Sequence, residues 1–576
     1  MAFHDSFTSD DGDIATGPLG QRVHRDALDH STRLEPRLWE VRAGVWCFVG
    51  NGLSNQTFIE APDGLIVIDT GECNQEMETA LAAVREHTDA PIGAVIYTHF
   101  HYVGGTQALF DAGAPDDLEI WGHRRIVANR ARYGLELSAA AGRGIVHQFG
   151  IGLPDDGEDA LVNVGLGRFF RNPAHAPFTE GFVAPNEMIA DVTRAQIAGL
   201  TVELTPAPSD ADDNVTIWFP DLGVCVNNLV WPALFNVFAI RGEEYRDPRV
   251  LLTGLDHVVS LGAEHLVGAH GPPLSGAERI STEVTAYRDS IQFLWDQTVR
   301  GINRGLTMDE LTEFVRLPER FADSYLTRQF YGLVEHHVRQ IHTGLRGWFD
   351  GDEASLLPVP HIERHRRLIE GFGGREVVLA QSRAALDQGN LRWALELATW
   401  LVRSEADAQG RADGGSELER RQLAAVLRAI GQRTTAANIR NWCLVRAREL
   451  EGALDLGRHR RHRFSAGAIG ANPLSSTVHA LRVLLDPTLA AGMHAELRFE
   501  LTDGQQVGLR LRDGVAVPTD GTTAELSITM EPATWIQLAS GRRDLSDAIE
   551  SGAVTTDDPD AVRAFFRPFD HESLTH

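Results

Sequence analysis

The 576-residue sequence contains no lysine, so all 53 of its basic residues are arginines. A lysine Schiff base and a lysine general base are therefore excluded, and arginine must bind any anionic group. The four cysteines are scattered without a Cys-x-x-Cys pair, which fits neither a disulfide scaffold nor a structural zinc site. No uninterrupted apolar run approaches the roughly 18 residues of a membrane-spanning helix.

The chain also lacks an excess of positive charge, because its formal net charge is −27. Such a charge repels nucleic acids and anionic membranes, so we expect neither as a partner. Residues 1–6 contain no basic segment followed by an apolar core, which argues against a secretion signal. We therefore expect a soluble, cytoplasmic protein. Its length predicts two to four domains, since a domain typically has roughly 100–200 residues.

The N-terminal part of the chain has an α/β pattern. Apolar runs at residues 64–69 and 92–97 predict buried strands, and residues 74–87 between them are patterned as a helix. Strand patterns recur from residue 200 to residue 269, so the first domain is expected to extend to about residue 345. Polar residues that follow the strands of such a sheet lie at one edge, where ligands usually bind.

Two further regions follow. Residues 376–451 are patterned as helices rich in Ala, Leu, Arg and Glu, and are expected to form two helical hairpins. Beyond them, a helical segment at residues 477–485 precedes alternating strand patterns separated by Asp-Gly turns, which predicts an α+β domain. One face of its sheet must be covered by helices, and this fits a filled core or an apolar tunnel equally.

A candidate metal motif follows the second apolar strand. In the segment Thr98-His-Phe-His-Tyr-Val-Gly-Gly105, two histidines stand two positions apart directly after the strand. His-x-His is a common half-site for zinc or iron when the chain turns at that point. The spacing alone fits two unrelated histidines as well.

This motif and several others resemble the alkyl sulfatase family of metallo-β-lactamase-fold hydrolases. The resemblance implies a metallo-β-lactamase αββα sandwich at residues 1–345, an all-α dimerisation domain at 346–457 and a sterol-carrier-like α+β domain at 458–576. It also implies a homodimer. The other segments that carry the resemblance are Asn55-Gln-Thr-Phe-Ile-Glu60, Asn163-Val-Gly-Leu-Gly167, Phe219-Pro-Asp221, Asn236, Arg241-Gly242, Arg246-Asp-Pro248 and Ala269-His-Gly-Pro-Pro273.

The sequence departs from the family at the metal motif itself. Where the family has Asp-His after the second histidine, this chain has only Tyr102-Val103 before the glycines, either as a two-residue deletion or with Val103 and Gly104 in place of the ligands. The two glutamate positions of the family fall on Asp210, which keeps a carboxylate, and on Asn228, which does not. Neighbouring acidic residues of the same loop, Asp212 or Asp213, are alternatives to Asp210.

The surviving ligand set is His99, His101 and Asp210, with His270 nearby by resemblance. Two histidines and a carboxylate suit one divalent metal, zinc or iron(II), with open coordination positions. One metal per chain is therefore expected. A site with two metals and a relic that binds none are the alternatives.

On the substrate side, the resemblance places Asn236 and Arg241 where the family binds its sulfate group. The planar guanidinium of arginine suits a tetrahedral oxyanion. For Arg246 a surface salt bridge with a neighbouring carboxylate is the better interpretation. Trp231 and Phe235 replace more polar positions of the family pattern, and predict a more apolar pocket wall.

The expected function is a metal-dependent, alkyl sulfatase-like hydrolase acting on a small anionic substrate with an apolar tail. Asp210, Tyr102 and Asn228 are its candidate catalytic residues, with Tyr102 filling the space of the second metal or donating to substrate. Tyr102 is also compatible with a packed aromatic of the core. Two other functions fit the same residues. They are an iron oxygenase or lyase using His99, His101 and Asp210, and a non-catalytic lipid-binding protein.

Overall fold

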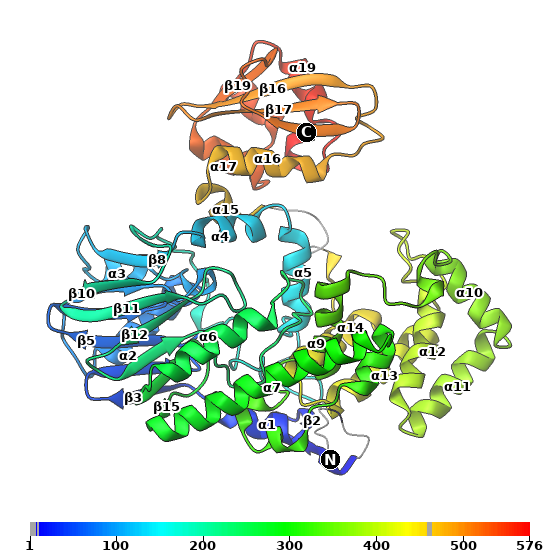
Figure 1. Cartoon of the computed structure of the whole chain (residues 1–576). Coiled ribbons are helices and arrows are strands. Elements are labelled where there is room, and N and C mark those ends of the chain that lie inside the picture. Colours follow the sequence, from blue (N-terminus) through cyan, green and yellow to red (C-terminus); the bar gives the residue numbers. More distant parts are fainter. Residues whose placement is uncertain (1–6, 8–10, 458–463, 576) are drawn as a thin grey trace. The chain divides into compact units, whose positions relative to one another are not determined.

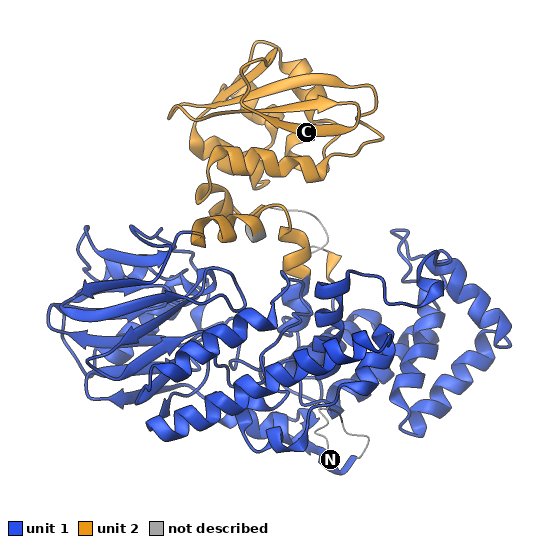
Figure 2. Cartoon of the chain, viewed as in Figure 1, with its two compact units in different colours: residues 1–124, 144–455 blue, residues 125–143, 456–576 orange. Residues whose placement is uncertain are grey.

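The computed structural model describes residues 7, 11–457 and 464–575 (Figure 1). The chain divides into two compact units, residues 1–124 with 144–455, and residues 125–143 with 456–576 (Figure 2). The first two expected domains thus fall together in the first unit, and the expected boundary at residue 458 lies outside the described residues. Residues 125–143 were expected to belong to the first domain, but they belong to the C-terminal unit. Leu135 packs into the apolar core of that unit.

Two mixed β-sheets form the N-terminal part of the first unit. In the seven-stranded sheet, neighbouring strands are antiparallel from β3 to β6 and parallel from β6 to β9. Its order is β3 (Arg37–Arg42), β4 (Val45–Val49), β5 (Gln56–Ala61), β6 (Gly64–Ile68), β7 (Ile92–Ile96), β8 (Glu119–His123) and β9 (Glu187–Ile189). The order of the six-stranded sheet is β10 (Thr193–Ile197), β11 (Leu200–Pro206), β12 (Val215–Phe219), β13 (Val224–Asn227), β14 (His265–Gly268) and β15 (Leu274–Ser275).

The two sheets pack face to face. Branched apolar side chains from both, such as Ile66, Ile96, Ile217 and Val226, form one buried cluster between them. Helices flank the sandwich, with one pair packed beside the first sheet and one pair beside the second. These are α2 (Asn74–Val84) and α3 (Gln107–Asp111), then α6 (Pro248–Ser260) and α7 (Ala277–Asn303). The predicted αββα sandwich is confirmed.

From residue 308 onward, the first unit is helical. Consecutive helices from α11 to α14 pack against one another, as expected for helical hairpins. The helices are α8 (Met308–Phe314), α9 (Val334–Arg346), α10 (His361–Gly371), α11 (Arg375–Asp387), α12 (Leu391–Arg403), α13 (Glu417–Arg433) and α14 (Ala437–Leu450). No helix among the described residues is long and apolar enough to cross a membrane.

The C-terminal unit is an α+β domain, as predicted. Aromatic side chains fill the space between its sheet and helices, with the ring of Phe499 5.5 Å from that of Trp535 and 6.0 Å from that of Phe566. This packing favours the filled core over the tunnel, and the likeness to sterol carriers stays a prediction. The sheet order is β18 (Val515–Thr519), β17 (Gln506–Arg512), β16 (His494–Leu501), β19 (Leu526–Met530) and β20 (Val554–Thr555). Helices that contribute to the core of this unit include α16 (Leu474–Ala480), α17 (Pro532–Ala539) and α19 (Pro559–Phe566).

Candidate metal site

The two motif histidines lie where the chain turns after β7. His99 has an extended backbone, with φ −171°, and is fully buried, whereas the side chain of His101 is 17% exposed. His101 belongs to a single 3-10 turn, Phe100–Tyr102, which turns its ring back toward His99, so that the two ring centroids are 4.9 Å apart. The expectation that the chain turns here is confirmed.

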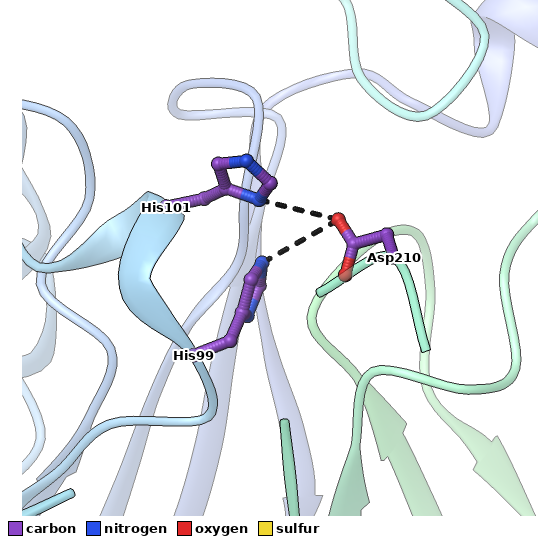
Figure 3. Close-up of side chains that lie close together, drawn as sticks. All are labelled: His99, His101 and Asp210. Carbon is purple, nitrogen blue, oxygen red and sulfur yellow. Dashed lines mark ion pairs between the residues drawn. The ribbon is translucent and has the colours of Figure 1, made fainter. Parts of the chain in front are cut away.

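Asp210 faces both histidines from the loop between β11 and β12 (Figure 3). Its Oδ2 lies 3.2 Å from Nδ1 of His101 and 3.7 Å from Nε2 of His99. The three ligand atoms all lie within 4.8 Å of one another, and no other such group of histidine, cysteine and carboxylate side chains occurs among the described residues. The donor set of two imidazole nitrogens and one carboxylate oxygen fits a single divalent metal.

Behind His99, a short relay fixes which of its nitrogens faces the site. Nδ1 lies 2.9 Å from Oγ1 of Thr98, which donates to Oδ2 of Asp69 at 2.6 Å. Thr98 Oγ1 therefore accepts the hydrogen on Nδ1, and Nε2 keeps its lone pair toward Asp210. Burial raises the pKa of Asp69 to about 7, against the opposing effect of the hydrogen bonds from Thr98.

Asn228 follows β13 and supports Asp210 rather than offering an oxygen to the metal. Nε1 of Trp231 donates to its Oδ1 at 3.1 Å, which fixes the orientation of the amide. The amide nitrogen then donates to Oδ1 of Asp210 at 2.7 Å and to Oδ1 of Asn214 at 2.8 Å, and it lies 3.4 Å from Nε2 of His99. This leaves Oδ2 of Asp210 facing the two histidines.

The three ligand side chains have strongly shifted pKa values. Burial lowers the pKa of His99 to about 3, so its imidazole is neutral. Burial also lowers the pKa of His101, but contacts with Asp210 and Glu243 outweigh it and raise the value to about 9. Despite burial, the nearby histidines hold the pKa of Asp210 well below its usual range. A metal bound here must displace the proton of His101.

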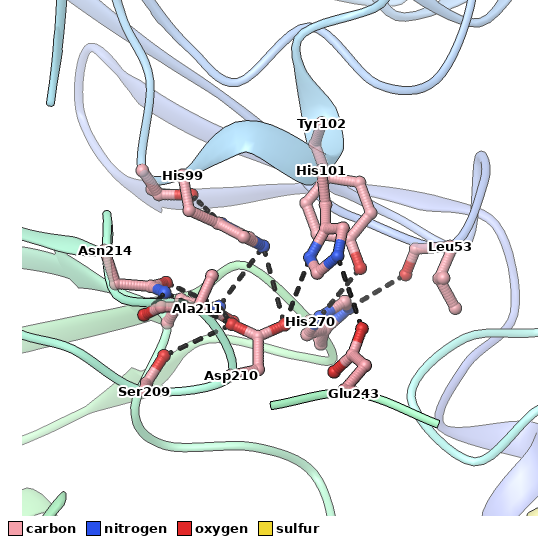
Figure 4. Close-up of polar contacts among 12 residues, drawn as sticks. Leu53, His99, His101, Tyr102, Ser209, Asp210, Ala211, Asn214, Glu243 and His270 are labelled. Carbon is pink, nitrogen blue, oxygen red and sulfur yellow. Dashed lines mark hydrogen bonds and ion pairs between the residues drawn. The ribbon is translucent and has the colours of Figure 1, made fainter. Parts of the chain in front are cut away.

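His270 lies close to the ligand cluster and faces Tyr102 (Figure 4). Its Nδ1 lies 3.0 Å from the carbonyl oxygen of Leu53, so the hydrogen is on Nδ1 and Nε2 is an acceptor. The hydroxyl of Tyr102 lies 3.3 Å from Nε2 and donates to it. Burial holds the pKa of Tyr102 well above its usual range, which keeps the phenol protonated. The nitrogen that His270 would offer to a metal is thus engaged.

The residues that replace the family's Asp-His pair are tightly packed. Val103 is fully buried. A Cβ added at Gly104 would lie 2.4 Å from the carbonyl oxygen of Glu72, closer than atoms can approach without a backbone shift. A ligand side chain cannot be placed at Gly104 in this backbone.

The arginines expected at the substrate side share one buried carboxylate. Arg241 and Arg246 both pair with Glu243, whose side chain is only 3% exposed. Arg246 also donates to the carbonyl oxygen of Asn236 at 2.7 Å. The expected salt bridge of Arg246 is present, but it is buried and not at the surface, since Arg246 is 4% exposed. Arg241 keeps 15% of its side chain exposed.

Asn236 is completely buried near these arginines. Neither its amide nitrogen nor its amide oxygen has a hydrogen-bond partner among the described residues, and the same is true of Nε2 of His337. A Cβ at Gly332 would touch both side chains, which places them side by side. Burial lowers the pKa of His337 to about 3. Buried polar groups without hydrogen-bond partners are rare in proteins.

Trp231 and Phe235, which the sequence predicts as an apolar pocket wall, lie in the buried apolar core of the first unit. Both are about 1% exposed, and their rings stack with centroids 4.2 Å apart. The ring of Trp231 meets that of His270 edge to face at 5.9 Å. Their direct contact with a substrate stays a prediction.

A cavity of about 1170 Å³ lies in the first unit. Phe149 lines it and lies under the guanidinium of Arg241, 5.9 Å from ring centroid to Cζ. Further apolar lining comes from Leu28 of α1 (Arg25–Thr32), from Leu161, and from Phe170, which stacks on Phe149 at 4.8 Å. The cavity was not predicted from the sequence.

Sequence reasoning also missed the role of Glu243. The residue was considered only as a salt-bridge partner of an arginine. Its position in the sequence between Arg241 and Arg246 indicated that it could pair with both arginines. Its proximity to His101 arises from the fold.

Three family models match the chain in order. The metallo-beta-lactamase superfamily matches residues 49–186, the alkyl sulfatase dimerisation family matches residues 307–453, and the alkyl sulfatase C-terminal family matches residues 464–574. The dimerisation match begins before residue 346, the expected boundary.

Individual relatives agree with these matches. A linear primary-alkylsulfatase from a Pseudomonas species is 34% identical over 510 residues, which are 86% of this chain and 92% of that protein. An (R)-specific secondary-alkylsulfatase from Pseudomonas is 28% identical over 91% of this chain and 78% of its own length. The solved structure of the stereoselective inverting sec-alkylsulfatase Pisa1 from Pseudomonas superimposes with a TM-score of 0.84 at 26% identity, covering 95% of this chain and 87% of that one.

Proposed function

Because the chain belongs to the alkyl sulfatase family of metallo-β-lactamase-fold hydrolases, we propose that it hydrolyses sulfate esters of apolar alcohols with one divalent metal. The observation that carries the proposal is the cluster of His99, His101 and Asp210, whose ligand atoms lie within 4.8 Å of one another. Beside it, Arg241 offers a partly exposed guanidinium to an anion. The comparisons give no support to an oxygenase, a lyase or a purely lipid-binding protein.

The chain's own residues have distinct roles in this reaction. When bound, a divalent metal supplies Lewis acidity that activates water near neutral pH. His99, His101 and Asp210 hold it, and Asn228 keeps Oδ2 of Asp210 turned toward the histidines. Arg241 binds the sulfate group and neutralises it as it leaves. Water is added across the ester, and the products are the alcohol and hydrogen sulfate.

We propose one metal per chain because of the hydrogen bonds and the packing of the neighbouring side chains. The second position lacks carboxylate ligands, because Asn228 donates through its amide nitrogen and Gly104 has no room for a side chain. Nε2 of His270 accepts from Tyr102. Zinc and iron(II) both accept the remaining donor set, and hydrolysis requires only Lewis acidity.

The cavity next to Arg241 is the proposed site of the apolar tail. Its aromatic and aliphatic lining, including Phe149 and Phe170, suits an alkyl chain whose sulfate end lies at Arg241. Each added CH₂ is then expected to improve binding by up to roughly 0.8 kcal/mol until the cavity is filled. This assigns tail selection to the first unit rather than to the C-terminal domain.

We also propose that two chains associate through the helical region. Side chains in the segment after α9 are unusually exposed for their size, with Trp348 68% and Leu357 91% exposed. Burying such side chains against a second copy would remove apolar surface from water. Light scattering that gives the monomer mass at micromolar concentration would contradict it.

The direct test of the function is sulfate release from linear primary alkyl sulfates of increasing chain length. We expect metal-dependent release, abolished by a chelator and restored by added metal. Arg241→Gln should lower kcat/KM by about 10- to 100-fold, since charge-assisted hydrogen bonds contribute roughly 1.5–3 kcal/mol. Release that is unaffected by metal removal would refute the proposed chemistry.

A further inference from the structure

Glu243 lies on the side of His101 that faces away from Asp210. It stands in the loop before α6, and its Oε1 is 3.7 Å from Nε2 of His101 (Figure 4). The same carboxylate pairs with Arg241 and with Arg246. It is thus one buried acceptor that faces three cationic or hydrogen-donating side chains.

The orientation of the His101 ring gives this contact its meaning. Nδ1 faces Oδ2 of Asp210 at 3.2 Å and therefore lies on the ligand side. An imidazole that binds a metal through one nitrogen carries its hydrogen on the other, and the partner of that hydrogen fixes the ring. For His101 the side chain that faces this other nitrogen is Glu243, whose Oε1 lies 3.7 Å from Nε2.

The two motif histidines therefore have different outer partners. His99 is fixed through the neutral hydroxyl of Thr98, with Asp69 behind it. His101 instead has the carboxylate of Glu243 3.7 Å from its outer nitrogen. A charged acceptor makes the imidazole a stronger donor to the metal than a neutral one does.

Building on the proposed function, we propose that Glu243 is a positioning residue that connects the metal site to the anion site. Its carboxylate pairs with Nε2 of His101 across 3.7 Å and so holds Nδ1 toward the metal. Through its pairing with Arg241, the same carboxylate fixes the guanidinium that binds sulfate. One buried side chain thereby sets the geometry of both ligand-binding groups.

Metal binding without substrate tests this inference. The apo full-length protein is titrated with zinc in competition with a chromophoric chelator, and with Co²⁺ to record the visible spectrum of the site. Glu243→Ala should weaken zinc binding by about 10- to 100-fold, the usual cost of losing an outer partner of a metal-binding histidine. Glu243→Gln retains an oxygen acceptor and should recover part of this loss. In both variants the Co²⁺ spectrum should shift.

Two controls separate the possible outcomes. Glu244→Gln alters the exposed neighbour and should leave both the zinc affinity and the spectrum unchanged. Thermal unfolding of the apo proteins identifies a variant that fails to fold, in which case the folded Glu243→Gln decides. A wild-type chain that binds no metal would refute the proposed function itself. Wild-type zinc affinity and an unchanged spectrum in folded Glu243→Gln would overturn only the role of Glu243.

Discussion

The two halves of the site differ in what their side chains leave free. In one half, His99, His101 and Asp210 each turn a ligand atom toward a common point. In the other half, the hydroxyl of Tyr102 and Nε2 of His270 are engaged with each other. Both halves are built from the same turn after β7, because Tyr102 directly follows His101 in the chain.

A histidine that lies close to other ligands is therefore not sufficient for a metal site. His270 is buried and close to the ligand cluster, yet its lone pair points at a phenol. A metal needs several donors whose lone pairs converge, and only the first half provides them. Variants of residues in each half test this difference.

Replacing one histidine in each half gives the sharpest contrast. His99→Ala should weaken metal binding by more than the roughly 100-fold that loss of an outer partner can cost, because it removes a direct ligand. His270→Ala should leave affinity within a few-fold of wild type. Elemental analysis and chelator competition measure both. Equal losses in the two variants would show that His270 is a ligand.

Gly104 tests whether the turn can accept a side chain at all. Gly104→Ala places Cβ against the carbonyl oxygen of Glu72 and should destabilise the protein by about 1–3 kcal/mol through overpacking. The control is Gly142→Ala in α5 (Ser138–Gln148), where a Cβ meets nothing within 4 Å. That change should be neutral or stabilise by up to about 1 kcal/mol. Thermal unfolding of the apo proteins compares them, and a stable Gly104→Ala would contradict the packing argument.

Tyr102→Phe frees Nε2 of His270 without changing the shape of the ring. We expect a modest destabilisation of about 1 kcal/mol, because a buried acceptor loses its donor. Metal content should stay at the wild-type value, since the carboxylates of the site, Asp210 and Glu243, already face the histidines of the first site and Arg241. A rise in metal content would show that Tyr102 alone blocks a second metal.

Much of this arrangement could be predicted from the sequence. The apolar strand before His99 and the His-x-His spacing predicted a candidate metal motif, and the resemblance to the family added Asp210 to it. These features are local along the chain, or fixed relative to a strand. They therefore survive without knowledge of the tertiary structure.

The remaining features depend on contacts between distant segments. The state of His270 depends on the carbonyl oxygen of Leu53 and on Tyr102, neither of which is near it in sequence. From the sequence, Glu243 is a neighbouring carboxylate that can pair with an arginine at the surface. Its contact with His101 depends on the tertiary structure. The assignment of residues 125–143 to the C-terminal unit likewise depends on which apolar core covers Leu135.

The metal content of the full-length wild-type protein tests the central claim most directly. After reconstitution with zinc or with iron(II) under anaerobic conditions and removal of loosely bound ions, elemental analysis gives the number of tightly bound metals per chain. The account predicts a value close to one, with His99, His101 and Asp210 as ligands. A value close to two, retained in His270→Ala, would mean that other side chains complete a second site. Such a result would contradict the distinction between the two halves.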